Sequence, residues 1–158
     1  MIDHYIQPKE IVIDSALSLV KYYPNYKRTL PWYQDLQICK QVDNRDSPYD
    51  RKLLSRMYRY LVKAGECYYI KFRENGRSRL IGDITLYDGK IAIVICKEYQ
   101  NRHLGRKAVA AVINRARQTG WTSVEAEIYS FNQQSRKMFT SVGFQQIAPE
   151  RYRLLLQN

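Results

Sequence analysis

The sequence predicts an α/β (α+β) fold in which a mixed, mostly antiparallel central sheet is flanked by helices. Two observations support this fold class. Strand-like segments joined by tight turns come first, and strand-like and helix-like segments then alternate toward the C-terminus. A third observation concerns domain number: residues 1–158 contain no internal repeat and no Gly/Ser-rich linker, so we expect a single domain.

The N-terminal third begins with a short apolar run, Ile11–Ile13, that is suited to open the sheet. Residues 22–49 contain prolines and many aromatic residues, and we expect them to be irregular. A helix should follow, because Asp50 suits an N-cap and Gly65 suits a helix end. Apolar side chains recur between them at helical spacing, at Leu53, Leu54, Met57, Leu61 and Ala64.

Three strands should come next. Cys67–Arg73 alternates apolar and polar side chains, and an Asn-Gly turn leads into Leu80–Tyr87. An Asp-Gly turn then leads into Ile91–Cys96, which is apolar on both faces. This pattern is typical of a central strand that is covered on both sides.

Helices and strands alternate in the C-terminal part. Residues 104–118 carry an apolar stripe at helical spacing, and Val124–Tyr129 alternates as a strand does. A short helix is expected over 133–142, ending at Gly143. Arg151–Leu156 is suited to form a last strand.

The composition limits the classes of function. No segment approaches the roughly 20 apolar residues of a membrane-spanning helix, and the N-terminus lacks the apolar core of a secretion signal. Cys39, Cys67 and Cys96 lie far apart, which disfavours a disulfide framework or a zinc site. We therefore expect a cytoplasmic protein without membrane association or metal. The net charge of +11 suits a partner that carries phosphate, either a nucleotide cofactor or nucleic acid.

The segment Ile91–Lys107 runs from an apolar strand through a turn into a basic helix. The first turn of a helix has N–H groups without internal partners and carries the positive end of the helix dipole. Its amides therefore suit a pyrophosphate, for which Gly105 would leave space. Positive charge around the turn comes from Arg102, Arg106 and Lys107.

This segment resembles the acetyl-CoA loop of the GNAT acetyltransferases, whose pattern is Gln/Arg-x-x-Gly-x-Gly/Ala. Gln100 matches the first position and Gly105 the last, whereas His103 stands at the first glycine. Residues 132–144, NQQSRKMFTSVGF, resemble the family helix Asn-x-x-Ser/Ala-x-x-Leu-Tyr-x-x-x-Gly-Phe. The matching residues there are Asn132, Ser135, Gly143 and Phe144. On these two motifs, the chain resembles a member of the GNAT superfamily.

The resemblance implies an N-acetyltransferase that uses acetyl-CoA as cosubstrate. The backbone of residues 93–95 would pair with the pantetheine arm, and the Ile95 N–H would donate to the thioester oxygen. The amides from Asn101 to Arg106 would hold the pyrophosphate. The implied cofactor-binding residues are Ile93, Val94, Ile95, Gln100, Asn101, Arg102, His103, Leu104, Gly105, Arg106, Lys107, Asn132, Ser135 and Phe139.

Attack on a thioester needs a neutral amine, and a lysine-like amine reaches that form at pH 7 at a cost of about 4–5 kcal/mol. A general base is therefore needed. Glu127 is our candidate, since its position resembles that of the base glutamate of GNAT enzymes that acetylate ribosomal-protein N-termini. Glu125 shares its face, and surface carboxylates are the alternative interpretation of both. Phe139 stands where the family often has a tyrosine as general acid, and phenylalanine cannot donate a proton.

The acceptor amine would belong to a small molecule or to a protein or peptide. We expect residues 22–49 to shape its pocket. Candidate ammonium anchors are Asp35, Asp43 and Asp46, and candidate walls are Trp32 and Tyr33.

Two other functions remain open at this stage. His103 and Phe139 depart from the family pattern and would suit a non-catalytic module that binds acyl-CoA. The basic charge would suit a nucleic-acid-binding domain, although no recognisable binding motif accompanies it. A homodimer is also compatible with the sequence.

Overall fold

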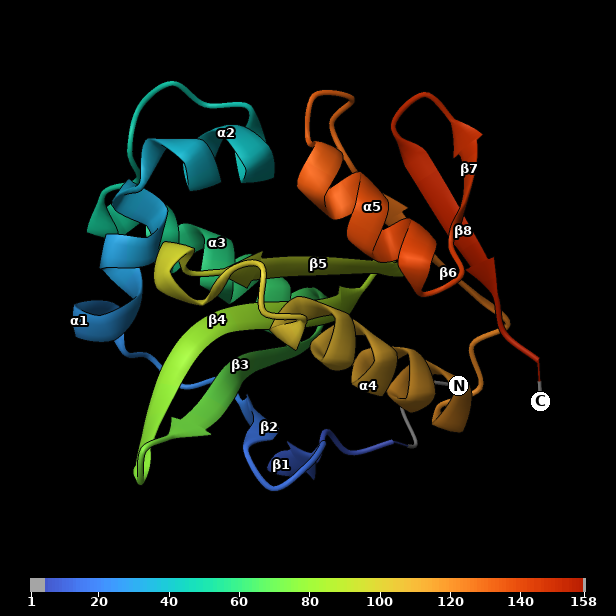
Figure 1. Cartoon of the computed structure of the whole chain (residues 1–158), viewed down its shortest axis with the longest axis horizontal. Coiled ribbons are helices and arrows are strands. Elements are labelled where there is room, and N and C mark those ends of the chain that lie inside the picture. Colours follow the sequence, from blue (N-terminus) through green and yellow to red (C-terminus); the bar gives the residue numbers. More distant parts are fainter. Residues whose placement is uncertain (1–4, 158) are drawn as a thin grey trace.

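The structure, a computed structural model, describes residues 5–157 and confirms the mixed α/β fold class (Figure 1). Eight strands form one sheet in the order β1-β2-β3-β4-β5-β6-β8-β7, and β5–β6 is its parallel pair. The strands are β1 Glu10–Val12, β2 Leu17–Lys21, β3 Gly65–Glu74, β4 Arg77–Tyr87, β5 Lys90–Ile95, β6 Ser123–Glu127, β7 Gln145–Ala148 and β8 Arg151–Leu155. The helices are α1 Tyr26–Thr29, η2 Leu30–Gln34, α2 Leu36–Asp43, α3 Arg51–Ala64, η3 Lys97–Tyr99, α4 Leu104–Gln118 and α5 Gln133–Ser141, with η marking 3₁₀ helices.

The predicted elements after residue 50 agree with the structure to within a few residues. The Asp50 side chain caps α3 by accepting from the Leu53 N–H at 2.8 Å. Helix α4 has the predicted bounds, whereas the strand expected at Val124–Tyr129 is the shorter β6. Strand β7 was not predicted, because it is short and its burial pattern does not alternate.

The expectation of an irregular segment over residues 22–49 was wrong. This segment contains α1, η2 and α2, and Pro31 lies in the first turn of η2, where a missing N–H costs nothing. The side chains of Asn25 and Asp35 cap α1 and α2. Trp32 and Tyr33 are buried, so the segment packs as a helical layer on the sheet.

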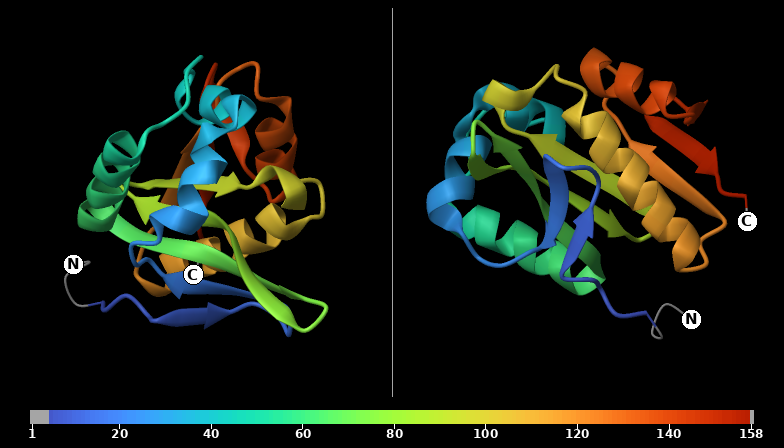
Figure 2. Two further views of the ribbon diagram at one scale, coloured as in Figure 1. Left: turned by 90° about the vertical axis from the view of Figure 1, so that its left-hand side faces the viewer. Right: turned by 60° about the horizontal axis from the view of Figure 1, so that its bottom comes forward.

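Helices cover both faces of the sheet. Helix α4 lies on the face that Ile93 and Ile95 of β5 form, because a side chain at Gly105 would meet these two residues at 3.6 Å. Helices α3 and η2 cover the other face, where both donate hydrogen bonds to Asp83 of β4. Figure 2 (left) shows α3 and α4 on opposite sides of the strands.

The parallel pair β5–β6 diverges soon after it begins. Its ladder in the described chain consists of the Lys90–Glu125 pair, next to which the Glu125 N–H donates to the Gly89 carbonyl at 2.8 Å. Strand β4, in contrast, pairs with every residue of β5. The C-terminal half of β5 therefore has a strand neighbour on one side and an open space on the other.

None of the helices within residues 5–157 has the length and apolar character needed to cross a bilayer. The same residues contain no cluster of three or more His, Cys, Asp or Glu side chains arranged to hold a metal ion. Cys39, Cys67 and Cys96 are free and buried.

Candidate active site

The space between β5 and β6 is a cleft of about 830 Å³, which lies in the size range of small-molecule sites. Most of the sequence-predicted site residues line it: Ile93, Val94, Ile95, Gln100, Asn101, His103, Leu104, Gly105, Arg106, Glu127, Asn132, Ser135 and Phe139. Arg102 and Lys107 do not line the cleft, and neither does Glu125. The fold thus brings together the loop before α4, the start of α5 and the end of β6.

The backbone of β5 presents alternate polar groups to the cleft. The Cys96 N–H donates to the Ile81 carbonyl at 2.8 Å, and Asp83 pairs with Val94 in the same antiparallel ladder. Because backbone groups along a strand point alternately to its two sides, Val94 bonds to β4 while Ile93 and Ile95 face the open side. The expectation that the Val94 backbone pairs with a ligand in the cleft is therefore not met, because its N–H and C=O are directed at β4. The backbone groups available there are those of Ile93 and the N–H of Ile95, since the Ile95 carbonyl accepts from the Gln100 side chain at 2.9 Å.

The loop between β5 and α4 has two non-glycine residues with left-handed backbone conformation. Asn101 has φ 63° and His103 has φ 62°, and His103 is the N-cap of α4 without a capping side-chain bond. Left-handed residues in such a loop turn successive N–H groups toward one concave side, which suits an anion. Gln100 stabilises the loop, since its Nε2 donates to the Ile95 carbonyl at 2.9 Å.

This conformation explains the family glycine at the position of His103. A left-handed backbone strains a residue with a Cβ by about 1–2 kcal/mol, and glycine avoids that strain. A Cβ added at Gly105 would meet Ile93 and Ile95, which themselves line the cleft, at an ordinary contact distance of 3.6 Å. The space expected at Gly105 for a ligand therefore stays a prediction.

The basic residues near this loop differ in what they contact. The Arg102 guanidinium pairs with Glu74 at 2.7 Å and lies over the rings of Phe72 and Tyr99. Lys107 pairs with Asp14 at 2.9 Å. Arg106, in contrast, lines the cleft, as does Lys137 of α5, which the sequence analysis missed. The positive charge available to a ligand in the cleft therefore comes from these last two residues.

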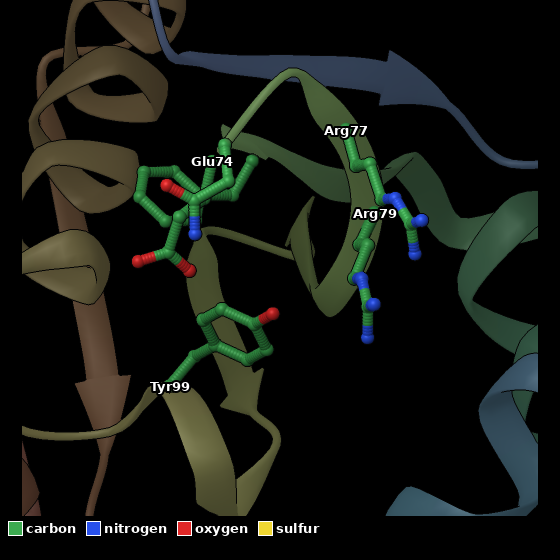
Figure 3. Close-up of a pocket in the computed structure, with 6 residues that line it drawn as sticks. Glu74, Arg77, Arg79 and Tyr99 are labelled. Atoms are coloured by element: carbon green, nitrogen blue, oxygen red, sulfur yellow. The ribbon is translucent and has the colours of Figure 1, made fainter.

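A second hollow of about 470 Å³ lies beside the loop, against the β3–β4 hairpin (Figure 3). Arg77 and Arg79 extend from the same strand in Figure 3, next to Glu74 and Tyr99. Tyr99 lines both hollows. Since Glu74 is already paired with Arg102, the two hairpin arginines leave this hollow positively charged.

The start of α5 forms one wall of the cleft. The side-chain oxygen Oδ1 of Asn132 accepts from the Ser135 N–H at 3.2 Å, and its side-chain Nδ2 donates to the Ser135 hydroxyl at 3.1 Å. Asn132 is thus the N-cap of α5, and its expected role in binding the cofactor stays a prediction. Phe139 is buried edge-on against Phe144, with ring centroids 5.0 Å apart, and offers no proton donor to the cleft.

The two carboxylates of β6 have different surroundings. Glu127 lines the cleft at its exposed edge and accepts a 2.6 Å hydrogen bond from the Lys90 ammonium group, which raises the pKa of that lysine. Glu125 is bound by Arg151 and Arg153, and the hydrogen bond from Arg151 is the main cause of the lowered pKa of Glu125. Glu125 is therefore the poorer candidate for a base.

A third carboxylate was missed by the sequence analysis. Asp83 lies at the floor of the cleft, is 3% exposed, and accepts hydrogen bonds from the hydroxyls of Tyr33 at 2.6 Å and Tyr58 at 2.7 Å. Burial raises its pKa from 3.8 to about 6, although the two hydrogen bonds oppose that shift. The available signal was a charged residue within the apolar segment Leu80–Tyr87, which is expensive unless it is satisfied or used.

The acidic residues expected to anchor an ammonium group serve other purposes. Asp35 caps α2, Asp43 accepts from the Tyr49 hydroxyl and Asp46 pairs with Lys40. None of the three lines the cleft. Of the two expected walls, Tyr33 lines it.

The model of the acetyltransferase (GNAT) domain matches residues 19–145, which is most of the chain. This protein belongs to the GNAT acetyltransferase family. The match covers the cleft, both motifs and the strands around them. The comparison with curated proteins gives no match.

Solved structures share the GNAT fold at low sequence identity. A domain from Methanocaldococcus jannaschii is 22% identical, with a TM-score of 0.77 over 90% of this chain and 100% of that one. Spermidine N-acetyltransferase from Vibrio cholerae, solved with CoA and spermine, is 13% identical, with a TM-score of 0.75 over 90% and 96%. An acetyltransferase from Salmonella typhimurium that modifies the N-terminal serine of ribosomal protein L7/L12 is 11% identical, with a TM-score of 0.74 over 94% and 99%.

Proposed function

We propose that this GNAT protein is an N-acetyltransferase that moves an acetyl group from acetyl-CoA to a primary amine by direct attack. The observation that carries the proposal is the open side of β5, where the backbone groups of Ile93 and Ile95 face a cleft that leads to the loop before α4. An extended chain beside β5 can pair with these groups as a strand would. A pyrophosphate at its other end would rest on the amides from Asn101 to Arg106.

The residues of the cleft fit acetyl-CoA. The first turn of α4 has N–H groups that make no intrahelical bond, since the Lys107 N–H is the first to bond back, to the His103 carbonyl at 3.3 Å. Arg106 and Lys137 add positive charge, and Ser135 and Phe139 line the path between loop and sheet. The relatives solved with CoA have the same fold, which supports this assignment.

Two groups of this chain would act on the reaction itself. The Ile95 N–H would donate to the thioester oxygen, where negative charge grows as the amine attacks. Glu127 would accept the proton that the amine loses, directly or through water. Its carboxylate is held at the cleft mouth by Lys90 and is 62% exposed, so the proton can pass on to solvent. Phe139 leaves the departing thiolate without a donor, which a thiol with a pKa of about 8.5 tolerates.

The test combines cofactor binding with turnover. Coenzyme A should raise the melting temperature of the wild-type protein, because a ligand that binds only the folded state stabilises it. Thiol release from acetyl-CoA should then be measured over a panel of amines and peptides. Glu127→Gln should lower kcat by about 100-fold or more with unchanged coenzyme A affinity. Glu125→Gln is the matched control, since Glu125 lies outside the cleft.

Three outcomes would argue against parts of this proposal. Unchanged turnover in Glu127→Gln removes Glu127 from the mechanism. Binding of coenzyme A without transfer to any amine would favour the non-catalytic acyl-CoA module. Absence of coenzyme A binding, together with salt-sensitive binding of RNA, would favour a nucleic-acid-binding domain.

The structure provides an argument against the nucleic-acid alternative. Three of the basic residues between Tyr99 and Val124 pair with acidic residues rather than facing solvent alone: Arg102 with Glu74, Lys107 with Asp14 and Arg115 with Glu66. Three of the five basic side chains in this segment are thus locally paired, whereas the net charge of +11, which already counts their acidic partners, is unchanged. A single domain, a cytoplasmic location and a homodimer stay predictions.

A further inference from the structure

Asp83 is a buried carboxylate without a cationic partner among residues 5–157. Both of its side-chain hydrogen bonds come from neutral tyrosine hydroxyls, and both end on Oδ2. Tyr33 belongs to η2 and Tyr58 to α3, so two separate elements hold one carboxylate oxygen in place. The orientation of Asp83 is therefore well defined, while its charge is not compensated.

The groups packed around Asp83 leave that charge in place at neutral pH. The titratable side chains facing it are Tyr33, Tyr58, Tyr69 and Cys67, and burial raises the pKa of each, so all four are neutral near pH 7. Above a pH of about 6, the site therefore holds one net negative charge in apolar surroundings. An unpaired buried charge destabilises the folded protein, and a cation bound beside it reduces that destabilisation.

The position of Asp83 points to the acceptor side of the proposed reaction. Asp83 pairs with Val94, between Ile93 and Ile95 along β5, and it lies on the face opposite α4. On that face the cleft wall is mostly apolar, made by Ile38, Val42, Met57 and Leu61 of α2 and α3, with Gln41 of α2 as the polar exception. A ligand there would meet the Asp83 carboxylate among mostly apolar side chains.

We propose that Asp83, oriented by Tyr33 and Tyr58, binds the ammonium group of the acceptor, and that the acceptor class is a primary amine on an apolar carbon chain. This inference rests on the proposed function and adds the substrate class. The contact with Asp83 favours the protonated amine. A second group must therefore take the proton before attack, which is the part assigned above to Glu127 at the cleft mouth.

The test is a binding titration that needs no turnover. The probes are n-butylammonium chloride and the uncharged n-butanol, each followed by backbone amide NMR with and without coenzyme A. The wild-type protein should bind the ammonium probe with shifts at the cleft residues, and Asp83→Asn should weaken that binding by at least about tenfold. Binding of n-butanol should change little between the two proteins. Glu127→Gln, which removes the exposed carboxylate of the same cleft, should keep most of the ammonium binding.

The variant and the pH dependence separate a binding role from a structural one. Asparagine keeps an oxygen that accepts from Tyr33 and Tyr58, so the fold should survive, and unchanged coenzyme A affinity checks this. Ammonium binding to the wild-type protein should weaken as the pH falls through about 6, because Asp83 becomes protonated. Equal ammonium binding by wild type and Asp83→Asn, or no binding by either, would overturn the inference. A wild-type protein that binds the ammonium probe but not coenzyme A would instead count against the proposed function.

Discussion

Replacing Asp83 with asparagine should stabilise the protein at neutral pH and give no such gain near pH 4. The reason is the raised pKa of this carboxyl group, which is 3.8 in its ordinary state and about 6 in the folded protein. Between these two values the folded state binds more protons than the unfolded state. Stability therefore falls as the pH rises through this window, and it levels off above a pH of about 6.

The size of the effect follows from the shift of about two pKa units. Each unit corresponds to about 1.4 kcal/mol, so ionised Asp83 destabilises the folded state by about 3 kcal/mol at neutral pH. Asparagine has no proton to lose and removes this penalty. For a chain of this size, the corresponding gain in melting temperature is about 6–12 °C.

The assay is thermal and denaturant unfolding of both proteins from about pH 4 to pH 8, without ligand. Several other carboxylates have lowered pKa values, and their contribution to the free energy of unfolding is lost as the pH falls. The wild-type curve alone therefore mixes opposite trends. Their contributions are the same in both proteins and cancel when the two unfolding free energies are subtracted. These carboxylates are Glu10, Asp14, Glu66, Glu74 and Glu125. A difference between the two proteins that does not change with pH would refute the assignment of a buried, uncompensated charge to Asp83.

Two further predictions concern the loop before α4. His103→Gly should be more stable than His103→Ala by about 1 kcal/mol, because alanine keeps the left-handed strain and glycine removes it; equal melting temperatures would contradict this reading of the loop. Arg106→Met should weaken coenzyme A binding by about tenfold, whereas Arg102→Met should weaken it less, because Arg102 is paired with Glu74. Calorimetric titration with coenzyme A measures both affinities. A larger loss in Arg102→Met would show that Arg102 leaves Glu74 for the ligand.

The local parts of the site could be predicted from the sequence. The strand into Ile95, the helix from Leu104 and the short helix after Asn132 depend on residues that are near one another in the chain. Their turn, cap and periodicity signals are therefore visible without the fold. The same is true of Phe139, whose missing hydroxyl follows from the residue type alone.

The non-local parts could not be predicted. Tyr33 and Tyr58 lie 50 and 25 residues from Asp83, and only the packing of η2 and α3 on one face of β4 brings the three together. The pairing of Glu125 with Arg151 and Arg153, and the side to which each β5 amide points, likewise depend on strand register.

The sequence by itself thus determined the family motifs, the order of most elements and the place of the loop before α4, since these rest on short-range patterns. Tertiary structure decided which carboxylates are free, paired or buried. The physical reason is that charge, burial and hydrogen-bond partners depend on neighbours in space, and in a sheet those neighbours come from distant parts of the chain.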